Sequence, residues 1–175
     1  EAEAERVAAE APRGKLFTVF STKGGVGKSL VAVNTAVALA QKGHRVCLVD
    51  LDVNSGDVAI MLQLSPTRNV NDLVTFRGVI DQGAIESLLT KHDERLSIVA
   101  APVTLDSPDQ ASGDEIGTLL DGLKAMFSYV VVDTSGVFDD QALAALDRSD
   151  SIILVGTLDI PALKGLKLAA STLDL

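Results

Sequence analysis

A glycine-rich stretch near the start of the chain contains the residues best suited to chemistry. It consists of Ser21, Thr22, Lys23, Gly24, Gly25, Val26, Gly27, Lys28 and Ser29. Glycines let a backbone wrap closely around an anion, and a helix that begins here would present free N–H groups and its positive dipole end. Lys28 is then placed to reach the β- and γ-phosphates of a nucleotide, and the Ser29 hydroxyl to ligate Mg²⁺. The pattern predicts a phosphate-binding loop; the alternative is a glycine-rich turn that happens to precede a helix.

Two residues of this loop depart from the usual phosphate-loop pattern. That pattern has glycine five places before the Gly-Lys-Ser end, where this chain has Thr22. Lys23 is the second unusual residue, because a phosphate-binding loop within a single chain does not need a cation at this position. Out of context it is a surface lysine that requires no explanation. The strict motif therefore fails, and the prediction depends on the loop joining a strand to a helix.

Aspartates follow two apolar runs further along the chain. Asp50 and Asp52 end the run that begins at Val46, and alternation along a strand puts both on the side that faces the phosphates. An aspartate at this place can hold the water shell of Mg²⁺ or orient the attacking water. The alternative is an aspartate that caps the following turn.

A second acidic position, Asp133, follows the β-branched run 130–132. This arrangement is typical of a strand whose acid holds Mg²⁺ through water. Gly136 gives the following loop the freedom to sense the γ-phosphate as a switch. An apolar run that ends in aspartate is a weak signal alone, but it becomes strong after a phosphate loop in the correct order and distance.

The apolar pattern also predicts the elements that must position these residues. Strands are expected at Leu16–Phe20, Val46–Val49, Leu96–Ala100, Tyr129–Val132 and Ile152–Val155. Helices are expected at Lys28–Gln41, Asp114–Met126, Asp139–Leu146 and Ala162–Leu173. Alternation of such strands and helices implies right-handed crossovers, a mostly parallel sheet and an α/β fold. Ligands of these sheets bind beyond the carboxyl ends of the strands, where the loop and the aspartates fall.

Composition narrows the class of protein. The 175 residues are 47% hydrophobic but only 3% aromatic, so the core must be aliphatic, as in a buried parallel sheet covered by helices. The net charge of −9 argues against a domain-wide electrostatic grip on nucleic acid or anionic lipid. The single cysteine, Cys47, excludes a disulfide framework and a four-thiolate metal site within one chain. Without a long apolar run or a signal peptide, we expect a soluble cytoplasmic protein.

The segment from Lys23 to Ser29 resembles the deviant Walker A motif of the ParA/MinD superfamily of dimeric ATPases. The resemblance implies a P-loop NTPase-type three-layer α/β/α fold and a homodimer that forms on binding ATP. It implies that Lys23 crosses the dimer interface to contact the nucleotide held by the partner. Asp52 would be tied to hydrolysis, with Lys23 and Lys28 as the other catalytic residues. The Mg²⁺ ligands would be Ser29, Asp50 and Asp133, the two aspartates acting through water.

Sequence around the second aspartate narrows the resemblance to one branch. Partitioning ATPases usually place Pro-Gln-Gly there, whereas this chain has Val53, Asn54 and Ser55. This form is similar to the CpaE/TadZ branch of Flp/Tad pilus assembly ATPases, as are segments 56–59, 70–73, 96–102, 127–133 and 143–150. The resemblance implies an ATP-driven switch that localises or assembles pilus or secretion machinery. It would act through protein partners at a cell pole or at the inner membrane.

The same resemblance predicts the domain organisation. Residues 1–14 are acidic and alanine-rich, and they fit the tail of a linker from a missing N-terminal receiver-like domain. A short helix and a remnant of cloning are the alternatives. Residues 15–175 would form the ATPase domain, C-terminally incomplete because members of the family continue with further strands and helices.

Two other functions stay open at this stage. One is partitioning of chromosomes or plasmids, or positioning of the division site, as ParA/MinD ATPases do. Riding on DNA would need a basic surface, which the net charge of −9 disfavours, and MinD-like positioning would need an amphipathic C-terminal helix. The other is a nucleotide-binding scaffold that never turns over.

Overall fold

Within the part of the chain that the computed structural model describes, residues 13–53, 55–102 and 110–173, the fold is built on one six-stranded sheet. The strands are β1 (Lys15–Phe20), β2 (Val46–Leu51), β3 (Thr90–Lys91), β4 (Leu96–Val99), β5 (Tyr129–Thr134) and β6 (Ser151–Leu154). Their spatial order is β3-β4-β2-β5-β1-β6. The pairs of neighbours are parallel, apart from the antiparallel pair β3 and β4. The mostly parallel sheet expected from the sequence is confirmed.

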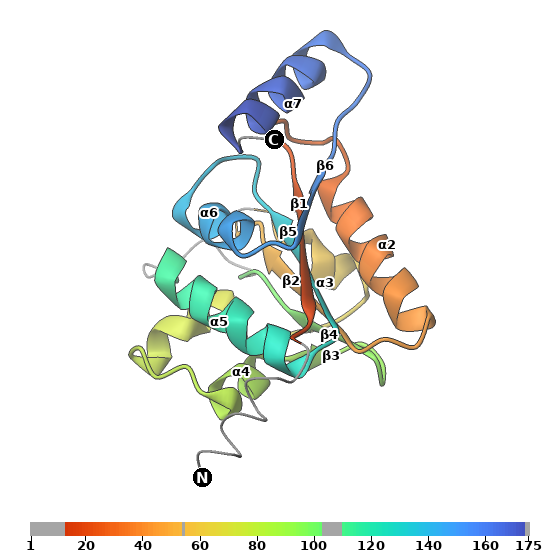
Figure 1. Cartoon of the computed structure of the whole chain (residues 1–175). Helices are drawn as coiled ribbons and strands as arrows, with labels where there is room; N and C mark the ends of the chain where they lie inside the picture. Colours follow the sequence, from red (N-terminus) through yellow and green to blue (C-terminus); the bar gives the residue numbers. More distant parts are fainter. Residues whose placement is uncertain (1–12, 54, 103–109, 174–175) are drawn as a thin grey trace.

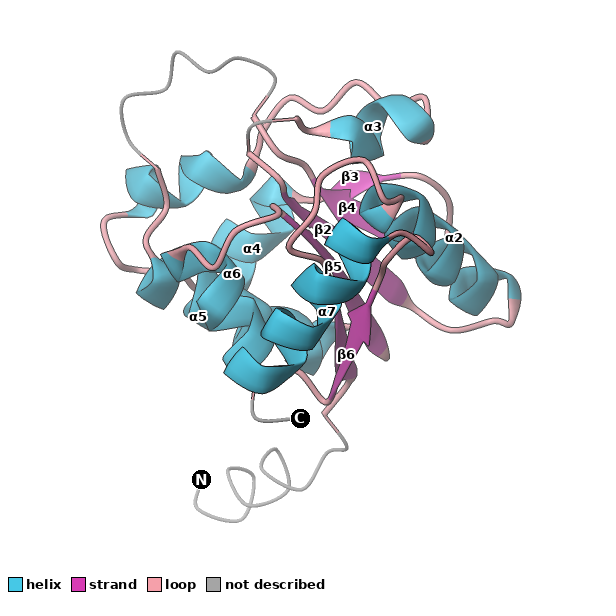
Figure 2. Cartoon of the chain, turned by 90° about the horizontal axis from the view of Figure 1, so that it is seen from above, coloured by secondary structure: helices cyan, strands magenta, loops and turns pink. Residues whose placement is uncertain are grey.

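Helices cover both faces of this sheet and give three layers (Figure 2). One face carries α2 (Lys28–Gln41) and α3 (Asp57–Met61). The other carries the 3-10 helix η1 (Val70–Phe76), α4 (Gln82–Leu88), α5 (Gly113–Met126) and α6 (Asp140–Asp147). The last helix, α7 (Ile160–Thr172), lies beside the loop that joins β1 to α2 (Figure 1). The chain therefore has the three-layer α/β/α architecture that the motifs predicted.

The core is aliphatic on both faces of the sheet. Leu119, Leu120 and Leu123 of α5 are fully buried against one face. On the other face, α2 contributes the small side chains of Ala32 and Ala36, both fully buried. Small residues let a helix approach the sheet closely while apolar area is still removed from water. This packing holds the first turn of α2 in a fixed place relative to the strand ends.

Aspartate N-caps set where two of the helices begin. Asp139 caps α6 and Asp159 caps α7, each accepting a hydrogen bond from a backbone N–H three residues further along. α6 therefore begins at Asp140 rather than at the expected Asp139, and α7 begins at Ile160 rather than at Ala162. The second difference also follows from proline, which the first turn of a helix accepts.

The apolar pattern did not indicate α3, η1, α4 or β3. These elements have 5, 7, 7 and 2 residues, too few for a helical or strand period to be recognised. The helices α2 and α5 have 14 residues each. None of the helices in the described part of the chain is long and apolar enough to cross a membrane.

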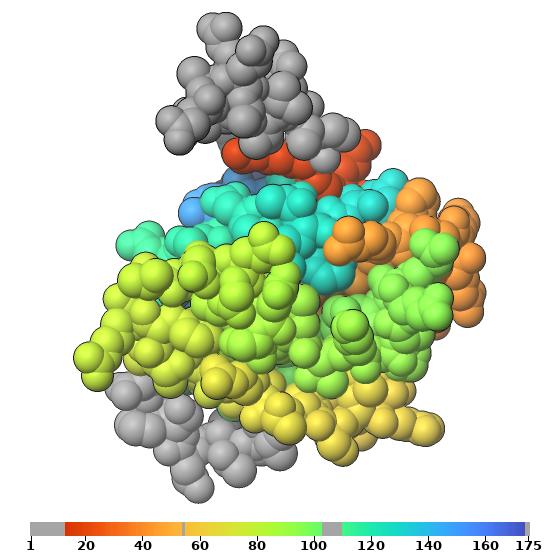
Figure 3. All heavy atoms as spheres, turned by 90° about the horizontal axis from the view of Figure 1, so that it is seen from below, coloured from red at the N-terminus to blue at the C-terminus, as the bar shows by residue number. Residues whose placement is uncertain are grey.

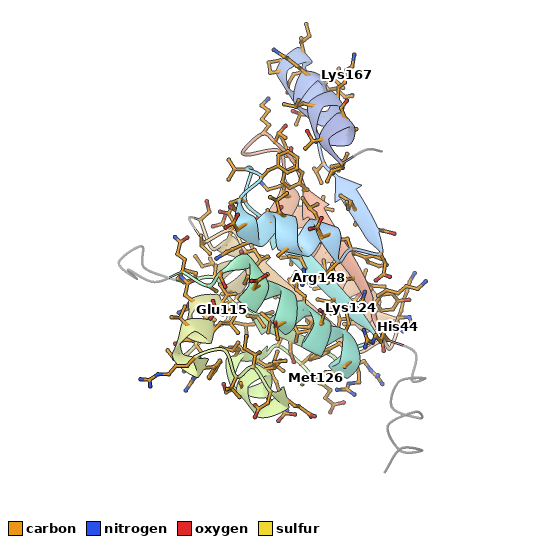
Figure 4. The ribbon with its side chains drawn as sticks, turned by 60° about the vertical axis from the view of Figure 1, so that its left-hand side comes forward. His44, Glu115, Lys124, Met126, Arg148 and Lys167 are labelled. Carbon is orange, nitrogen blue, oxygen red and sulfur yellow. The ribbon has the colours of Figure 1, made fainter. Side chains whose placement is uncertain are left out.

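Ion pairs join α5 to the segment that follows α6 (Figure 4). The Nε atom of Arg148 lies 3.4 Å from the Asp121 carboxylate, and Nζ of Lys124 lies 2.9 Å from that of Asp150. Asp150 also accepts a hydrogen bond of 2.7 Å from the backbone N–H of Leu16. These contacts hold the start of β1 beside α5, at the end of the sheet opposite to α7.

Figure 3 shows the molecule from below, where residues 80–100, coloured yellow-green to green, form much of the surface. A pocket of about 390 Å³ involves this segment together with Arg45 and Phe127. The Arg45 guanidinium lies 5.6 Å from the centre of the Phe127 ring, a cation–π distance. Basic and acidic side chains both line the pocket, so it does not select for an anion or a cation.

The packing predicts a clear difference between two leucine substitutions. Leu120→Ala removes a fully buried side chain, and we expect it to lower the free energy of unfolding by about 2–5 kcal/mol. Leu168→Ala removes a side chain that is 61% exposed, and should change stability by no more than about 0.5 kcal/mol. Urea unfolding followed by circular dichroism measures both. Equal losses in the two variants would contradict the assignment of the core.

Candidate phosphate-binding site

A cleft of about 540 Å³ lies at the carboxyl ends of the central strands. Three segments surround it: the loop from β1 into α2, the residues after β2, and the loop after β5. The lining residues are Gly24, Gly25, Gly27, Lys28, Ser29, Leu30, Asp52, Ser55, Asp57, Met61, Ser135, Gly136 and Val137. The segments come together because parallel neighbours end at the same edge of the sheet. The structure thus unites three stretches that the sequence pattern singled out.

The loop between β1 and α2 has the backbone shape of an anion cradle. Gly25 and Gly27 have φ angles of 71° and 99°, in the left-handed region that glycine adopts without strain. Gly27 is the N-cap of α2 and supplies no side-chain cap, so the first N–H groups of the helix are left to bind a ligand. Val26, which the sequence pattern places in the binding loop, is not among the residues that line the cleft.

Lys28 brings a positive charge into this cradle. The residue is only 7% exposed, and its ammonium forms no ion pair with any residue in the described ranges. A buried cation without a partner is costly unless a ligand supplies the opposite charge. The position of Lys28 in the wall of the cleft therefore favours an anionic ligand.

Two buried carboxylates lie behind the loop, on neighbouring strands. Asp50 of β2 and Asp133 of β5 are partners in the register of the sheet, and they are 1% and 0% exposed. Burial and the Asp133 charge raise the pKa of Asp50 to about 7. Burial raises the pKa of Asp133 to about 6, although the nearby Ser29 hydroxyl and Lys28 ammonium lower it. A nearby cation would stabilise the ionised form of both carboxylates.

The two carboxylates differ in their hydrogen bonds. Asp50 accepts from the backbone N–H groups of Asp52 and Val58, at 3.0 and 3.3 Å. Among the residues described, both oxygens of Asp133 are buried and accept no hydrogen bond. A fully buried carboxylate without a donor is rare in folded proteins. Asp133 therefore has free acceptors for the water shell of a cation.

These residues fit the Mg²⁺ site that we predicted. No group of three or more His, Cys, Asp and Glu side chains in the described ranges could hold a metal ion directly. Mg²⁺ commonly keeps several waters and takes few protein ligands beside phosphate oxygens. Ser29 in the cleft, with Asp133 and Asp50 behind it, matches a site of that kind.

Asp52 lines the cleft, whereas Asp50 does not. The expectation that both face the phosphates is therefore wrong for Asp50. Its physical reason is that β2 ends at Leu51, so the alternation of a strand does not extend to Asp52. The chain turns here instead, with the Asp52 carbonyl accepting from the N–H groups of Ser55 and Gly56 at 3.1 and 2.8 Å. Asp52 is left half-buried at the edge of the cleft.

Gly136 lies across the cleft from the glycine-rich loop. A Cβ atom at this position would lie 3.9 Å from the backbone nitrogen of Gly24, so the two loops are in close contact. The neighbouring Ser135 hydroxyl donates a hydrogen bond of 2.9 Å to Asp139, which also caps α6. A displacement of Gly136 by a bound phosphate would therefore reach α6, as expected of a switch loop.

Lys23 forms its ion pair with α7 and does not line the cleft. Its ammonium forms an ion pair of 2.8 Å with Asp159, at the start of α7. The structure places Lys23 outside the lining of the cleft, which agrees with the view that a single chain does not need it to cradle phosphate. Asp159, Ser55, Asp57 and Ser135 were not predicted as site residues. Ser55 and Asp57 belong to segments that carry the family resemblance but were given no role at the site, and Asp159 comes near the loop only in the folded chain.

The fold is an α/β fold of the P-loop NTPase type with a cleft suited to phosphate, and the comparisons with known proteins agree with it. The chain belongs to the family described as "AAA domain", whose model matches residues 14–175. Septum site-determining protein MinD of Bacillus subtilis (strain 168) is 31% identical over 153 residues, covering 86% of this chain and 56% of that protein. The chain thus spans about half the length of the curated relatives it matches. The similarity to MinD agrees with the ParA/MinD superfamily that the glycine-rich loop resembles.

Solved structures agree with this assignment. A plasmid partition protein from Borrelia burgdorferi B31 bound to AMPPNP is 27% identical, with a TM-score of 0.76 and coverage of 93% of this chain and 71% of that one. A ParA family ATPase from Chlorobium tepidum TLS has a TM-score of 0.80 at 23% identity, covering 92% and 69%. MinD of Pyrococcus horikoshii OT3, complexed with Mg-ADP, has a TM-score of 0.78 at 22% identity, covering 92% and 65%. The last two likenesses show a shared fold.

The raised pKa values predict how stability depends on pH in the absence of ligands. The pKa values of Asp133 and Asp50, about 6 and about 7, exceed the 3.8 of an ordinary aspartate. The folded chain therefore keeps protons that the unfolded chain releases, so stability should fall as pH rises from about 4 to 7. Asp133→Asn cannot ionise, and should raise the free energy of unfolding at pH 8 by roughly 1–3 kcal/mol.

This gain should shrink steadily toward pH 4, where the native aspartate is neutral at little cost. Urea unfolding at a series of pH values, without nucleotide or Mg²⁺, measures it. Asp147→Asn alters an exposed aspartate of α6 and serves as the matched control. A gain that grows on acidification, or no gain at pH 8, would show that Asp133 is not a destabilised charge.

Proposed function

We propose that the chain is the nucleotide-binding core of a ParA/MinD-type ATPase that binds Mg-ATP, dimerises on it and hydrolyses it. The observation that carries the proposal is the buried Lys28 at a glycine-rich helix start, near the carboxylate of Asp133. Within the described part of the chain, Lys28 has no ion-pair partner and Asp133 has no hydrogen-bond donor. A triphosphate with its cation would satisfy both charges at once. The AMPPNP-bound partition protein and the Mg-ADP-bound MinD support this choice of ligand.

Each residue of the site has a part in the proposed reaction. The N–H groups of the glycine-rich loop and the Lys28 ammonium would hold the phosphates and orient the γ-phosphate. Ser29 would contact Mg²⁺, and Asp133 and Asp50 would hold it through water. Mg²⁺, when bound, neutralises charge on the β- and γ-phosphates. Asp52, at the edge of the cleft, would orient the attacking water.

Dimerisation would complete the site. Lys23 lies on the loop but outside the lining of the cleft, and the resemblance of this loop to the deviant Walker A motif implies that Lys23 reaches a nucleotide held by another chain. ATP would then favour the dimer because its phosphates accept the partner's Lys23, and hydrolysis would remove that contact. The cycle would act as a switch between two states of association.

Two cellular processes are candidates for this switch, positioning of the ParA/MinD type and pilus assembly. The MinD relative and the partition-protein structure favour a positioning role of the ParA/MinD type. The pilus assembly role rests on a narrower observation. Val53, Asn54 and Ser55 stand in place of Pro-Gln-Gly, and segments 56–59, 70–73, 96–102, 127–133 and 143–150 are similar to the pilus branch; Asn54 lies outside the described residues. The net charge of −9 favours protein partners over DNA as the surface on which the switch acts.

Two lysine substitutions separate binding from dimerisation. Lys28→Ala should weaken ATP binding at least tenfold, because a charge-assisted contact to phosphate is lost. Lys23→Ala should leave ATP binding intact and abolish the dimer that forms with a non-hydrolysable ATP analogue. Calorimetry and light scattering measure the two effects. Lys167→Ala, on the exposed side of α7 (Figure 4), is the matched control. A dimer that survives Lys23→Ala would contradict completion of the site by a partner.

A third substitution tests hydrolysis. Asp52→Ala should slow ATP turnover by about a hundredfold or more, because water activation contributes at least that much to catalysis. ATP binding and dimerisation should persist, so the slow variant should stay dimeric for longer. Phosphate release and light scattering follow both properties. If Asp52→Ala slows turnover no more than Asp147→Ala, an exposed surface change, the chain fits a scaffold that does not use Asp52 for catalysis.

A further inference from the structure

The Lys23 side chain is held within its own chain by a well-defined acceptor. Its Nζ atom donates to both carboxylate oxygens of Asp159, at 3.0 and 2.8 Å. Asp159 is fixed in turn, because it accepts from the backbone N–H of Ala162 at 2.9 Å and from the Thr157 hydroxyl. Together these contacts hold the pKa of Asp159 at about 2, so the carboxylate stays ionised at neutral pH.

The ion pair joins two elements that also touch elsewhere. Lys23 belongs to the phosphate loop, and Asp159 caps α7. Further along α7, a Cβ atom on Gly165 would lie 2.3 Å from the Thr22 hydroxyl, so the helix backbone rests directly on the loop. Thr22 is the residue that replaces the usual first glycine of a phosphate loop. The start and the middle of α7 therefore both contact the glycine-rich loop.

We infer that Asp159 is a positioning residue that holds Lys23 in its own chain until the nucleotide of a partner displaces it. The inference rests on the proposed function, in which Lys23 contacts phosphate across a dimer interface. The Lys23 ammonium is bound by both oxygens of Asp159 and must leave them to reach the partner's phosphate. Each chain must therefore give up this pair before the dimer closes, and the pair resists dimerisation without nucleotide.

The exposure of the pair suits a reversible contact. The side chains of Lys23 and Asp159 are 41% and 39% exposed, and ion pairs of this kind favour the paired state by about 1.4- to 5-fold. Two such pairs would have to open for each dimer. Their removal should therefore tighten dimerisation by about 2- to 25-fold. A phosphate inside a closed interface is the stronger acceptor, because charge-assisted hydrogen bonds gain strength away from water.

Asp159→Asn tests the inference without removing the helix cap, because asparagine caps helices as well as aspartate does. Dimerisation of the purified protein with Mg²⁺ and a non-hydrolysable ATP analogue is followed by light scattering at low ionic strength. We expect half-dimerisation at about 2- to 25-fold lower protein concentration than in the unsubstituted chain. The difference should largely disappear in about 1 M NaCl, where exposed charges are screened. Asp159→Glu should restore the original behaviour.

Two further variants complete the experiment. Asp81→Asn makes the same change at the N-cap of α4, which has no lysine partner among the described residues, and should leave dimerisation unchanged. Thr157→Val removes one hydrogen bond to Asp159 without touching the cap, and should shift dimerisation in the same direction by a smaller factor. Thermal unfolding checks that all variants are folded.

The outcomes separate this inference from the proposed function. If the unsubstituted chain dimerises, Lys23→Ala does not, and Asp159→Asn behaves as the unsubstituted chain, the positioning role is wrong while the function stands. Weaker dimerisation of Asp159→Asn would also overturn it, because Asp159 would then support the dimer. If Lys23→Ala dimerises as the unsubstituted chain does, the proposed function is wrong, and the positioning role of Asp159 is wrong with it.

Discussion

The structure depends on the cost of burying charges at the carboxyl ends of the central strands. Lys28 is nearly buried, and Asp50 and Asp133 are adjacent in the register of β2 and β5. Burial limits the hydration of these groups, and within the described residues neither Lys28 nor Asp133 has an ion-pair partner. Such an arrangement is tolerated only where the surrounding fold holds it in place and a ligand can compensate it. The Lys28 charge favours an anionic ligand, and the buried carboxylates of Asp133 and Asp50 favour a cation bound together with it.

The rest of the domain holds these groups in position. The aliphatic core on both faces of the sheet fixes the strand ends, and the buried alanines of α2 fix its first turn against them. The left-handed glycines then aim the N–H groups of α2 into the cleft. The glycine-rich loop also contacts elements outside the cleft, namely Gly136 in the loop after β5 and the helix α7. A change in the loop is thereby linked to α6 through Asp139 and to α7 through Asp159.

Local signals predicted much of this structure. The bounds of α2 match the expected Lys28–Gln41, because Gly27 and Gly43, both with positive φ angles, mark its ends. The position of each motif directly after a strand predicted where the cleft lies, since parallel strands end at the same edge of the sheet. The sequence did not predict that Asp50 would be buried behind Asp52, because that depends on where β2 ends. Nor did it predict the pairing of Lys23 with Asp159, 136 positions away, because that contact exists only once α7 is placed on the loop.

The magnesium dependence of ATP binding tests the central claim most directly. Calorimetric titration of the purified protein with a non-hydrolysable ATP analogue, with and without Mg²⁺, measures it in the unsubstituted chain and in Asp133→Asn. The account predicts one nucleotide per chain, and binding that weakens about tenfold or more when Mg²⁺ is removed. It also predicts that Asp133→Asn loses most of this dependence, because groups that support a metal through water contribute about 10- to 100-fold to its affinity. Binding that ignores Mg²⁺, or Mg²⁺ dependence that survives Asp133→Asn unchanged, would contradict the account.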